Sequence, residues 1–136
     1  MTRGVRLLLE AGQRVPHPRT LSRLAAQVAR SEKLTGDVNL VFCSDEKIRE
    51  LNRKFRGLNR ITDVLSFSWE EPDFAGEVYI ANPQALRQAS RWNNSYFNEL
   101  RRLSVHGMLH LCGYDHVKPR DRAKMRHAEE KYLKNR

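Results

Sequence analysis

The sequence is poor in features that would place it in a special structural class. Only two cysteines occur among its 136 residues, Cys43 and Cys112, and they are far apart in the chain. Small secreted domains held together by disulfides carry several cysteine pairs, so we expect two buried free thiols in a reducing compartment. Repeats, low-complexity segments and linkers are lacking as well, which excludes a modular array.

Long hydrophobic runs are also absent. No apolar run approaches the ~18–20 residues that a membrane-spanning helix needs, and Met1 to Arg6 lack the apolar core and cleavage site of a secretory signal. We therefore expect a cytoplasmic protein with no membrane partner. Hydrophobic residues make up 40% of the chain and charged residues 30%, a composition typical of a soluble globular protein.

Acidic residues are few relative to basic ones. The chain has 25 Lys and Arg residues against 16 Asp and Glu residues, a net charge of +9 at pH 7, and its pI is near 10.1. This excess in a short chain is the electrostatic footprint of a nucleic-acid-binding protein, although other basic proteins share it. Charge therefore favours a phosphate-bearing partner without identifying it.

What the sequence does contain is an alternation of strand-like and helix-like periodicity. It predicts strands at 5–10, 38–43, 64–69 and 76–81, and helices at 21–29, 45–56, 83–92, 97–111 and 121–133. The short connection at 70–73 favours antiparallel pairing of the last two strands. We predict an α+β (mixed α/β) fold, with a small sheet of about four strands covered by helices and a central histidine-bearing helix. A chain of this length has room for one domain, residues 1–136.

Capping residues predict where three of these helices begin. Ser44 precedes two acidic residues, which the helix dipole favours in a first turn. Asn82 precedes Pro83, which suits the first helical position. Thr20 is the candidate N-cap of the first helix, because Pro16-His17-Pro18 is expected to form a loop with a solvated imidazole.

Three of the five histidines fall within the eleven residues from His106 to His116. His106 and His110 share one helix face, since residues four apart lie one turn apart. Gly113 can end that helix and let the chain bring His116 back. Single histidines are usually ordinary hydrogen-bonded residues, but the full spacing H-x-x-x-H-x-x-G-x-x-H is typical of a metal site.

Three neutral imidazoles leave the fourth position of a tetrahedral zinc ion open, as in catalytic sites. Zinc peptidases use the same spacing, with a Glu directly after the first His as general base. Gly107 holds that position here, and Glu99 lies seven residues before His106, too far along a helix to replace it. A mid-helix glycine costs about 1 kcal/mol relative to alanine, so we expect Gly107 where a side chain would collide with the sheet or the substrate.

The stretch from His106 to His116 reads HGMLHLCGYDH, and Leu51-Asn52, Arg56-Gly57 and the run TDVLSF at 62–67 precede it. In this order, these motifs resemble the bacterial YbeY family of metal-dependent endoribonucleases over most of the chain. The resemblance implies a single α/β domain and one zinc ion per chain, with a catalytic site formed by Arg56, which handles phosphate, and three zinc ligands, His106, His110 and His116.

The function implied by the resemblance is that of a single-strand-specific, zinc-dependent endoribonuclease, a hydrolase that cleaves phosphodiesters. The implied role is ribosomal RNA maturation, at the 3′ end of 16S rRNA, and ribosome quality control. Its partners would be single-stranded RNA and the small ribosomal subunit; we expect a monomer that binds no DNA. Two alternatives remain: a zinc metallopeptidase-like hydrolase, and a non-catalytic ribosome-binding factor with structural zinc.

Several roles stay open at the level of the sequence. Arg56 would offset negative charge on the phosphorane, because a guanidinium is always charged and can bind two oxygens. Asp63 and Asp115 are candidates either to orient imidazole N–H groups or to cap helices. His127 is expected on the basic surface of the last helix and not among the ligands. The attacking oxygen is either that of water or the RNA 2′-hydroxyl.

Overall fold

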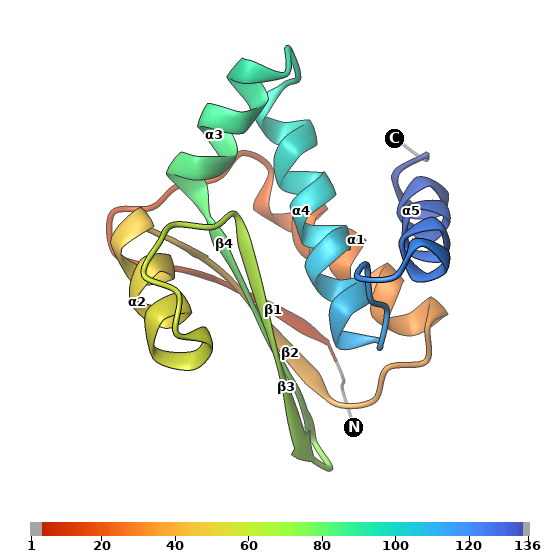
Figure 1. The fold of residues 1–136 in the computed structure, drawn as a ribbon. Coiled ribbons are helices and arrows are strands. Elements are labelled where there is room, and N and C mark those ends of the chain that lie inside the picture. Colours follow the sequence, from red (N-terminus) through yellow and green to blue (C-terminus); the bar gives the residue numbers. More distant parts are fainter. Residues whose placement is uncertain (1–3, 135–136) are drawn as a thin grey trace.

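The computed structural model describes residues 4–134, which form a mixed sheet and the helices that cover it (Figure 1). In chain order the elements are β1 (Val5–Leu9), α1 (Pro18–Ser31), β2 (Asp37–Cys43), α2 (Asp45–Arg56), β3 (Val64–Glu71), β4 (Phe74–Ala81), α3 (Asn82–Arg91), α4 (Tyr96–Leu111) and α5 (Pro119–Leu133). The predicted α+β fold with four strands is confirmed.

The strand order in the sheet is β1-β2-β4-β3. β1 pairs with β2, and β2 with β4, in parallel, whereas β3 and β4 form an antiparallel hairpin. The antiparallel pairing predicted from the short connection is therefore confirmed. Because β3 is an edge strand of this sheet, one of its sides is free to line a cavity.

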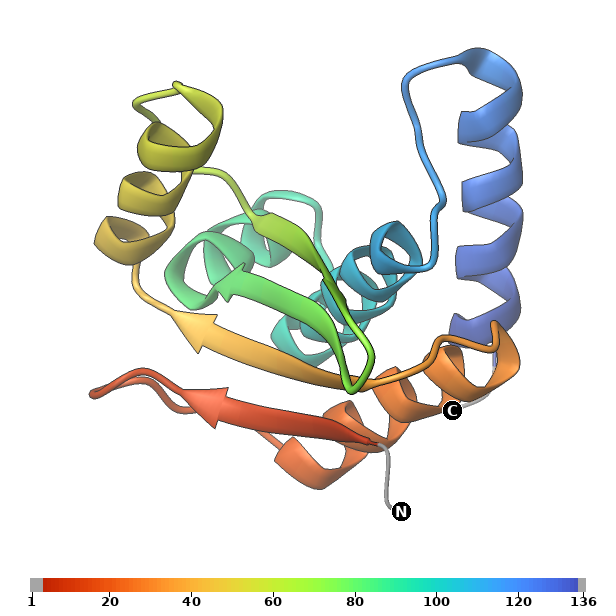
Figure 2. The same ribbon diagram turned by 90° about the horizontal axis from the view of Figure 1, so that it is seen from below.

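Helices cover both faces of the sheet, and α4 is the central one. α2 packs on one face through a small apolar cluster that includes Ile48, Leu51 and Leu65. The other helices lie on the opposite face (Figure 1), where α4 contacts β3, β4, α1, α3 and α5. In Figure 2, α2 and α5 lie on opposite sides of the β3–β4 hairpin. The predicted central position of the histidine-bearing helix is confirmed.

α4 approaches the sheet most closely at Gly107. A Cβ atom there would lie 2.3 Å from Val78 Cγ1 and 3.1 Å from Val64 Cγ2. The Ser66 hydroxyl donates a hydrogen bond of 2.9 Å to the Gly107 carbonyl. From the sequence, a side chain at this position is expected to collide with either the sheet or the substrate. The structure shows the collision with the sheet. The depth of α4 against β3 and β4 sets the position of the neighbouring His106.

Two of the three predicted N-caps are wrong. α1 begins at Pro18, after His17 in a left-handed conformation (φ 47°, ψ 58°), because Pro18 suits a first helical turn and the His17 ring packs against Phe97, with centroids 5.1 Å apart. Asn82 does not cap α3: its side-chain amide donates to the Arg14 carbonyl at 3.0 Å. Ser44 is confirmed, since its hydroxyl accepts from the Lys47 amide at 3.1 Å.

The two cysteines are free thiols, Cys43 buried and Cys112 only half-buried. Burial raises the pKa of Cys43 to about 12 and that of Cys112 to about 11, so both stay protonated at neutral pH. Between residues 4 and 134, no helix has the length and apolar character that a bilayer crossing requires.

Replacing Gly107 with Ala should destabilise the fold. The new Cβ would overlap Val78 Cγ1, and overpacking of this kind outweighs the helix-propensity gain of about 1 kcal/mol. We expect the free energy of unfolding, measured in urea, to fall by on the order of 2 kcal/mol. Gly4→Ala is the control, because nothing lies within 4 Å of a Cβ there. Equal stability of the two variants would mean that α4 does not need a glycine at this contact.

Candidate metal centre

The three histidines of the motif lie together. His106 and His110 project from α4, and His116 comes from the loop that follows it. Their ring centroids are 4.8, 4.9 and 5.5 Å apart, and one nitrogen from each ring can be chosen so that all three lie within 4.8 Å of one another. Two nitrogens bound to a tetrahedral zinc ion at about 2 Å are roughly 3.4 Å apart. The cluster predicted from spacing could therefore hold such an ion with small side-chain movements.

The loop after α4 is shaped by its backbone hydrogen bonds. Gly113 has φ 99°, which favours glycine, and its amide donates to the His110 carbonyl at 3.0 Å. The Asp115 carboxylate accepts from the amides of His116 at 2.6 Å and Val117 at 3.2 Å. Neither role predicted for Asp115 is found among the described residues: its carboxylate accepts from loop amides and from no imidazole, and the N-cap of α5 is Lys118. Asp115 instead holds the turn that presents His116.

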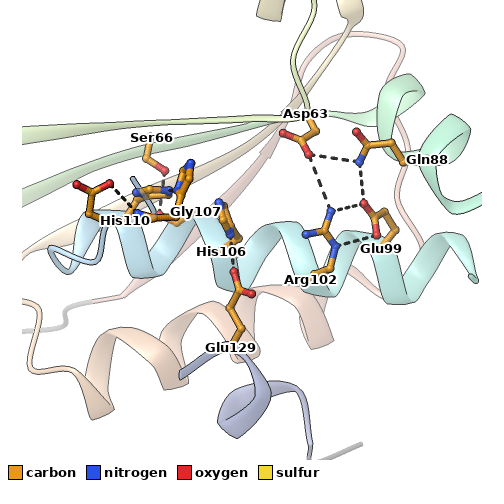
Figure 3. Close-up of polar contacts among 11 residues, drawn as sticks. Asp63, Ser66, Gln88, Glu99, Arg102, His106, Gly107, His110 and Glu129 are labelled. Atoms are coloured by element: carbon orange, nitrogen blue, oxygen red, sulfur yellow. Dashed lines mark hydrogen bonds and ion pairs between the residues drawn. The ribbon is translucent and has the colours of Figure 1, made fainter. Parts of the chain in front are cut away.

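His106 is oriented by a residue that the sequence analysis missed. Its Nδ1 atom contacts Oε2 of Glu129, which lies on α5 (Figure 3). A carboxylate at Nδ1 favours the tautomer with its proton there, which leaves the Nε2 lone pair for a metal. His106 and Glu129 are 23 residues apart in the sequence, and no motif links them. Their contact depends on how α5 docks on α4.

The environment of His110 keeps its imidazole neutral. Burial, together with the neighbouring rings of His106 and His116, lowers the pKa of His110 to about 4. Neutral imidazole is the form that binds metal, and three such nitrogens suit zinc. The donor set therefore fits the ion that the motif suggests. His127, in contrast, is exposed on α5 and outside the cluster, as predicted.

The histidines border a cavity of about 440 Å³ that all four predicted site residues share. It is lined by Arg56, Thr62, Asp63, Val64, Ser66, Ser68, Arg102, His106, His110 and His116. The first six come from the end of α2, the loop after it and β3, and the others come from α4 and its following loop. Distant segments of the chain thus meet where the edge strand β3 passes α4.

Arg56 reaches this cavity because of how α2 ends. Gly57 caps the helix in a left-handed conformation, φ 70°. The buried Asn52 donates from its side-chain amide to the Arg60 carbonyl at 3.0 Å, which ties the loop back to the helix. The paired motifs Leu51-Asn52 and Arg56-Gly57 therefore form one local unit that presents Arg56.

A polar network missed from the sequence lies beside the cluster (Figure 3). Arg102 donates to the completely buried Glu99 from Nε at 3.0 Å and from Nη2 at 2.7 Å. Gln88 donates to Glu99 at 2.8 Å and to Asp63 at 3.3 Å. Asp63 Oδ2 also lies 3.9 Å from Arg102 Nη2. In the described part of the chain, Asp63 therefore contacts this network and no imidazole, so its proposed role towards a ligand is wrong.

Comparison with known proteins agrees with these observations. The family model for Endoribonuclease YbeY matches residues 14–136. A protein named Endoribonuclease YbeY from Thermodesulfovibrio yellowstonii is 41% identical over 72% of this chain and 65% of its own length. One from Endomicrobium trichonymphae is 39% identical over 87% of this chain and 84% of its own. The solution structure of TM1509 from Thermotoga maritima is similar with a TM-score of 0.68 and 32% identity, over 96% of this chain and 87% of that one.

Removing the Glu129 carboxylate should weaken zinc binding without unfolding the chain. We expect Glu129→Ala to lower zinc affinity about 10- to 100-fold, the usual cost of losing a carboxylate behind a histidine ligand. Glu129→Gln should lose less, because its carbonyl can still accept from Nδ1–H. Competition with a chelating dye measures the affinity, and Glu130→Ala, an exposed neighbour on α5, is the control. Equal affinities for the Glu129→Ala and Glu130→Ala variants would refute this role.

Proposed function

The chain belongs to the endoribonuclease YbeY family, and on that basis we propose that it is a zinc-dependent endoribonuclease that cleaves single-stranded RNA. One observation carries the proposal: the three-histidine cluster and Arg56 line the same cavity of about 440 Å³. That arrangement combines a site for a hydrolytic metal with a permanent positive charge, and both can assist phosphodiester cleavage.

His106, His110 and His116 would hold the ion. When bound, zinc supplies a Lewis acid and a way to generate a nucleophile at neutral pH. Glu129 keeps the His106 ring in one orientation through Nδ1, and Asp115 keeps the His116 loop in place. Arg56 would bind non-bridging phosphate oxygens as negative charge grows on them, because its planar guanidinium can donate to two oxygens at once.

Size and charge support single-stranded RNA as the substrate. A cavity of about 440 Å³ lined by two arginines and the three histidines suits a segment of a flexible single strand. The net charge of +9 favours association with a polyanion. From the resemblance we further propose that the RNA is ribosomal. The protein would act in the cytoplasm as a monomer carrying one zinc ion, on the 3′ end of 16S rRNA at the small subunit and in ribosome quality control. It would not act on DNA.

The alternatives are less well supported. A peptidase needs a carboxylate base beside the metal, but Gly107 faces Val78 of the sheet. Among residues 4–134, the acid that lines the cavity is Asp63, and it pairs with Gln88 and Arg102. A structural zinc ion would hold its ligands in place itself. Here α4 is held by packing on the sheet and the His116 loop by Asp115.

The proposal is tested by removing the metal. Zinc-loaded protein should cleave a single-stranded RNA and leave a duplex and an unstructured peptide intact, and chelation should abolish cleavage with little change in circular dichroism or melting. His110→Ala should carry less than one zinc ion per chain by elemental analysis, whereas His127→Ala should retain one. Peptide cleavage would favour the peptidase, and loss of cooperative folding on chelation would favour structural zinc.

Two Arg56 variants should distinguish the effect of the positive charge from that of the planar guanidinium group. We expect Arg56→Ala to slow single-turnover cleavage about a hundredfold, on the order of 3 kcal/mol, by analogy with loss of an oxyanion-hole donor. Arg56→Lys should rescue poorly, because an ammonium keeps the charge but loses the planar fork. Zinc content and RNA affinity should change little in both.

Arg53→Ala is the matched control for Arg56, since Arg53 is an exposed arginine on the same helix and does not line the cavity. A wild-type cleavage rate in Arg56→Ala would mean that Arg56 is only part of a solvated helix end.

A further inference from the structure

A row of polar residues follows the face of α4 that borders the cavity. Glu99, Arg102, His106 and His110 are three, four and four residues apart, which keeps them on one face of the helix. Arg102 lies one turn before His106, about 6 Å along the helix axis. Arg102 lines the same cavity as the three histidines and Arg56. The cavity therefore has a second guanidinium, which none of the motifs includes.

The guanidinium group of Arg102 is held along one of its edges. Its hydrogen bonds and ion pairs with described residues all use Nε and Nη2, with Glu99 at 3.0 and 2.7 Å and Asp63 at 3.9 Å. Its guanidinium carbon lies 5.8 Å from the centroid of the Trp92 ring. An arginine has five N–H donors, so the Nη1 edge can still donate. Glu99 and Asp63 contact the guanidinium at Nε and Nη2, and Glu129 on α5 also interacts with its charge. Among the described residues, Nη1 is therefore the edge that remains for an anion.

Stability alone is a poor explanation for this arrangement. Glu99 has a side chain only 1% exposed, whereas that of Arg102 is 35% exposed. Burying a carboxylate is costly, and replacing a buried ion pair with apolar residues often loses no stability. A buried acid that fixes a partly exposed arginine beside a cavity acts instead as a device that orients the arginine, because a preorganised group loses less entropy on binding.

We propose that Arg102 binds the phosphate of the nucleotide next to the cleaved one, with Glu99 and Gln88 as the residues that position its guanidinium. This inference rests on the proposed function. The cleaved phosphate would lie between the histidine cluster and Arg56, and the cavity continues from His106 to Arg102 one helix turn away. The ligand is a second phosphodiester of the same single strand, held by charge-assisted hydrogen bonds to Nη1.

The variant that tests Arg102 leaves the net charge unchanged. Arg102→Gln combined with Glu99→Gln replaces the ion pair with two amides that can bond to each other, while the amide at 99 still accepts from Gln88. Long-range attraction of RNA is then the same as in the wild type. Arg87→Gln with Asp45→Asn is the matched control, because this partly exposed pair, 2.9 Å apart, does not line the cavity.

The experiment is single-turnover cleavage of a short single-stranded RNA in which one phosphate at a time is a neutral methylphosphonate. In the wild type and the control pair, neutralising the phosphate next to the cleavage site should reduce cleavage about tenfold, the effect of one hydrogen bond to a charged group. In the Arg102/Glu99 variant the same modification should have almost no further effect. The proposal would be overturned if neutralising a phosphate reduced cleavage equally in the wild type, the control pair and the Arg102/Glu99 variant, whichever phosphate is modified.

A binding measurement checks the contact without catalysis. For an RNA that carries a 2′-deoxy nucleotide and a non-hydrolysable linkage at the cleavage site, the slope of log affinity against log salt should become shallower by about 0.7 in the variant, as for the loss of one single-strand phosphate contact. An unchanged slope would contradict the proposal. Absence of RNA cleavage by the zinc-loaded wild type would instead refute the proposed function.

A second variant covers failure of the first to fold. Arg102→Met with Glu99→Leu replaces the same pair with apolar side chains of similar length, an exchange that buried ion pairs often tolerate. It also preserves the net charge, and it should show the same loss of sensitivity to the methylphosphonate. Urea unfolding of each variant is measured first, so that cleavage is compared only between folded proteins.

Discussion

The close contact between α4 and the sheet at Gly107 is the constraint on which the site depends. A Cβ at this position would lie 2.3 Å from Val78, so only glycine lets the helix lie this deep. The depth places His106 beside the first half of β3 and allows the Ser66 hydroxyl to reach the Gly107 carbonyl. The edge strand β3 on one side and α4 on the other then border the cavity.

Acidic residues organise the site of this basic protein. Glu129 reaches His106 from α5, Asp115 shapes the loop that carries His116, and Glu99 holds Arg102 from inside the core. Each carboxylate acts on a neighbouring side chain or backbone amide and is itself paired. The surplus of positive charge can therefore attract a polyanion while the few acids keep the histidines and Arg102 in defined positions.

The fold and the histidine cluster were predictable because they depend on local signals. Helical spacing unites His106 with His110, Gly113 provides the turn that returns His116, and a two-residue turn makes β3 and β4 antiparallel. Helix starts were less predictable. α1 begins at Pro18, and the ring of the preceding His17 packs on Phe97. Asn82 bonds to Arg14 instead of capping α3. In both cases a residue at the helix start makes a contact that is distant in sequence.

The sequence by itself determined which segments form strands and helices, the spacing of the three histidines and the excess of positive charge, since periodicity and spacing act within a few residues. Only the tertiary structure decided the strand order β1-β2-β4-β3, the contact of Glu129 with His106, and the network of Glu99, Arg102, Gln88 and Asp63. These depend on how whole elements dock. Docking is set by the packing of many side chains at once, which no single spacing in the sequence encodes.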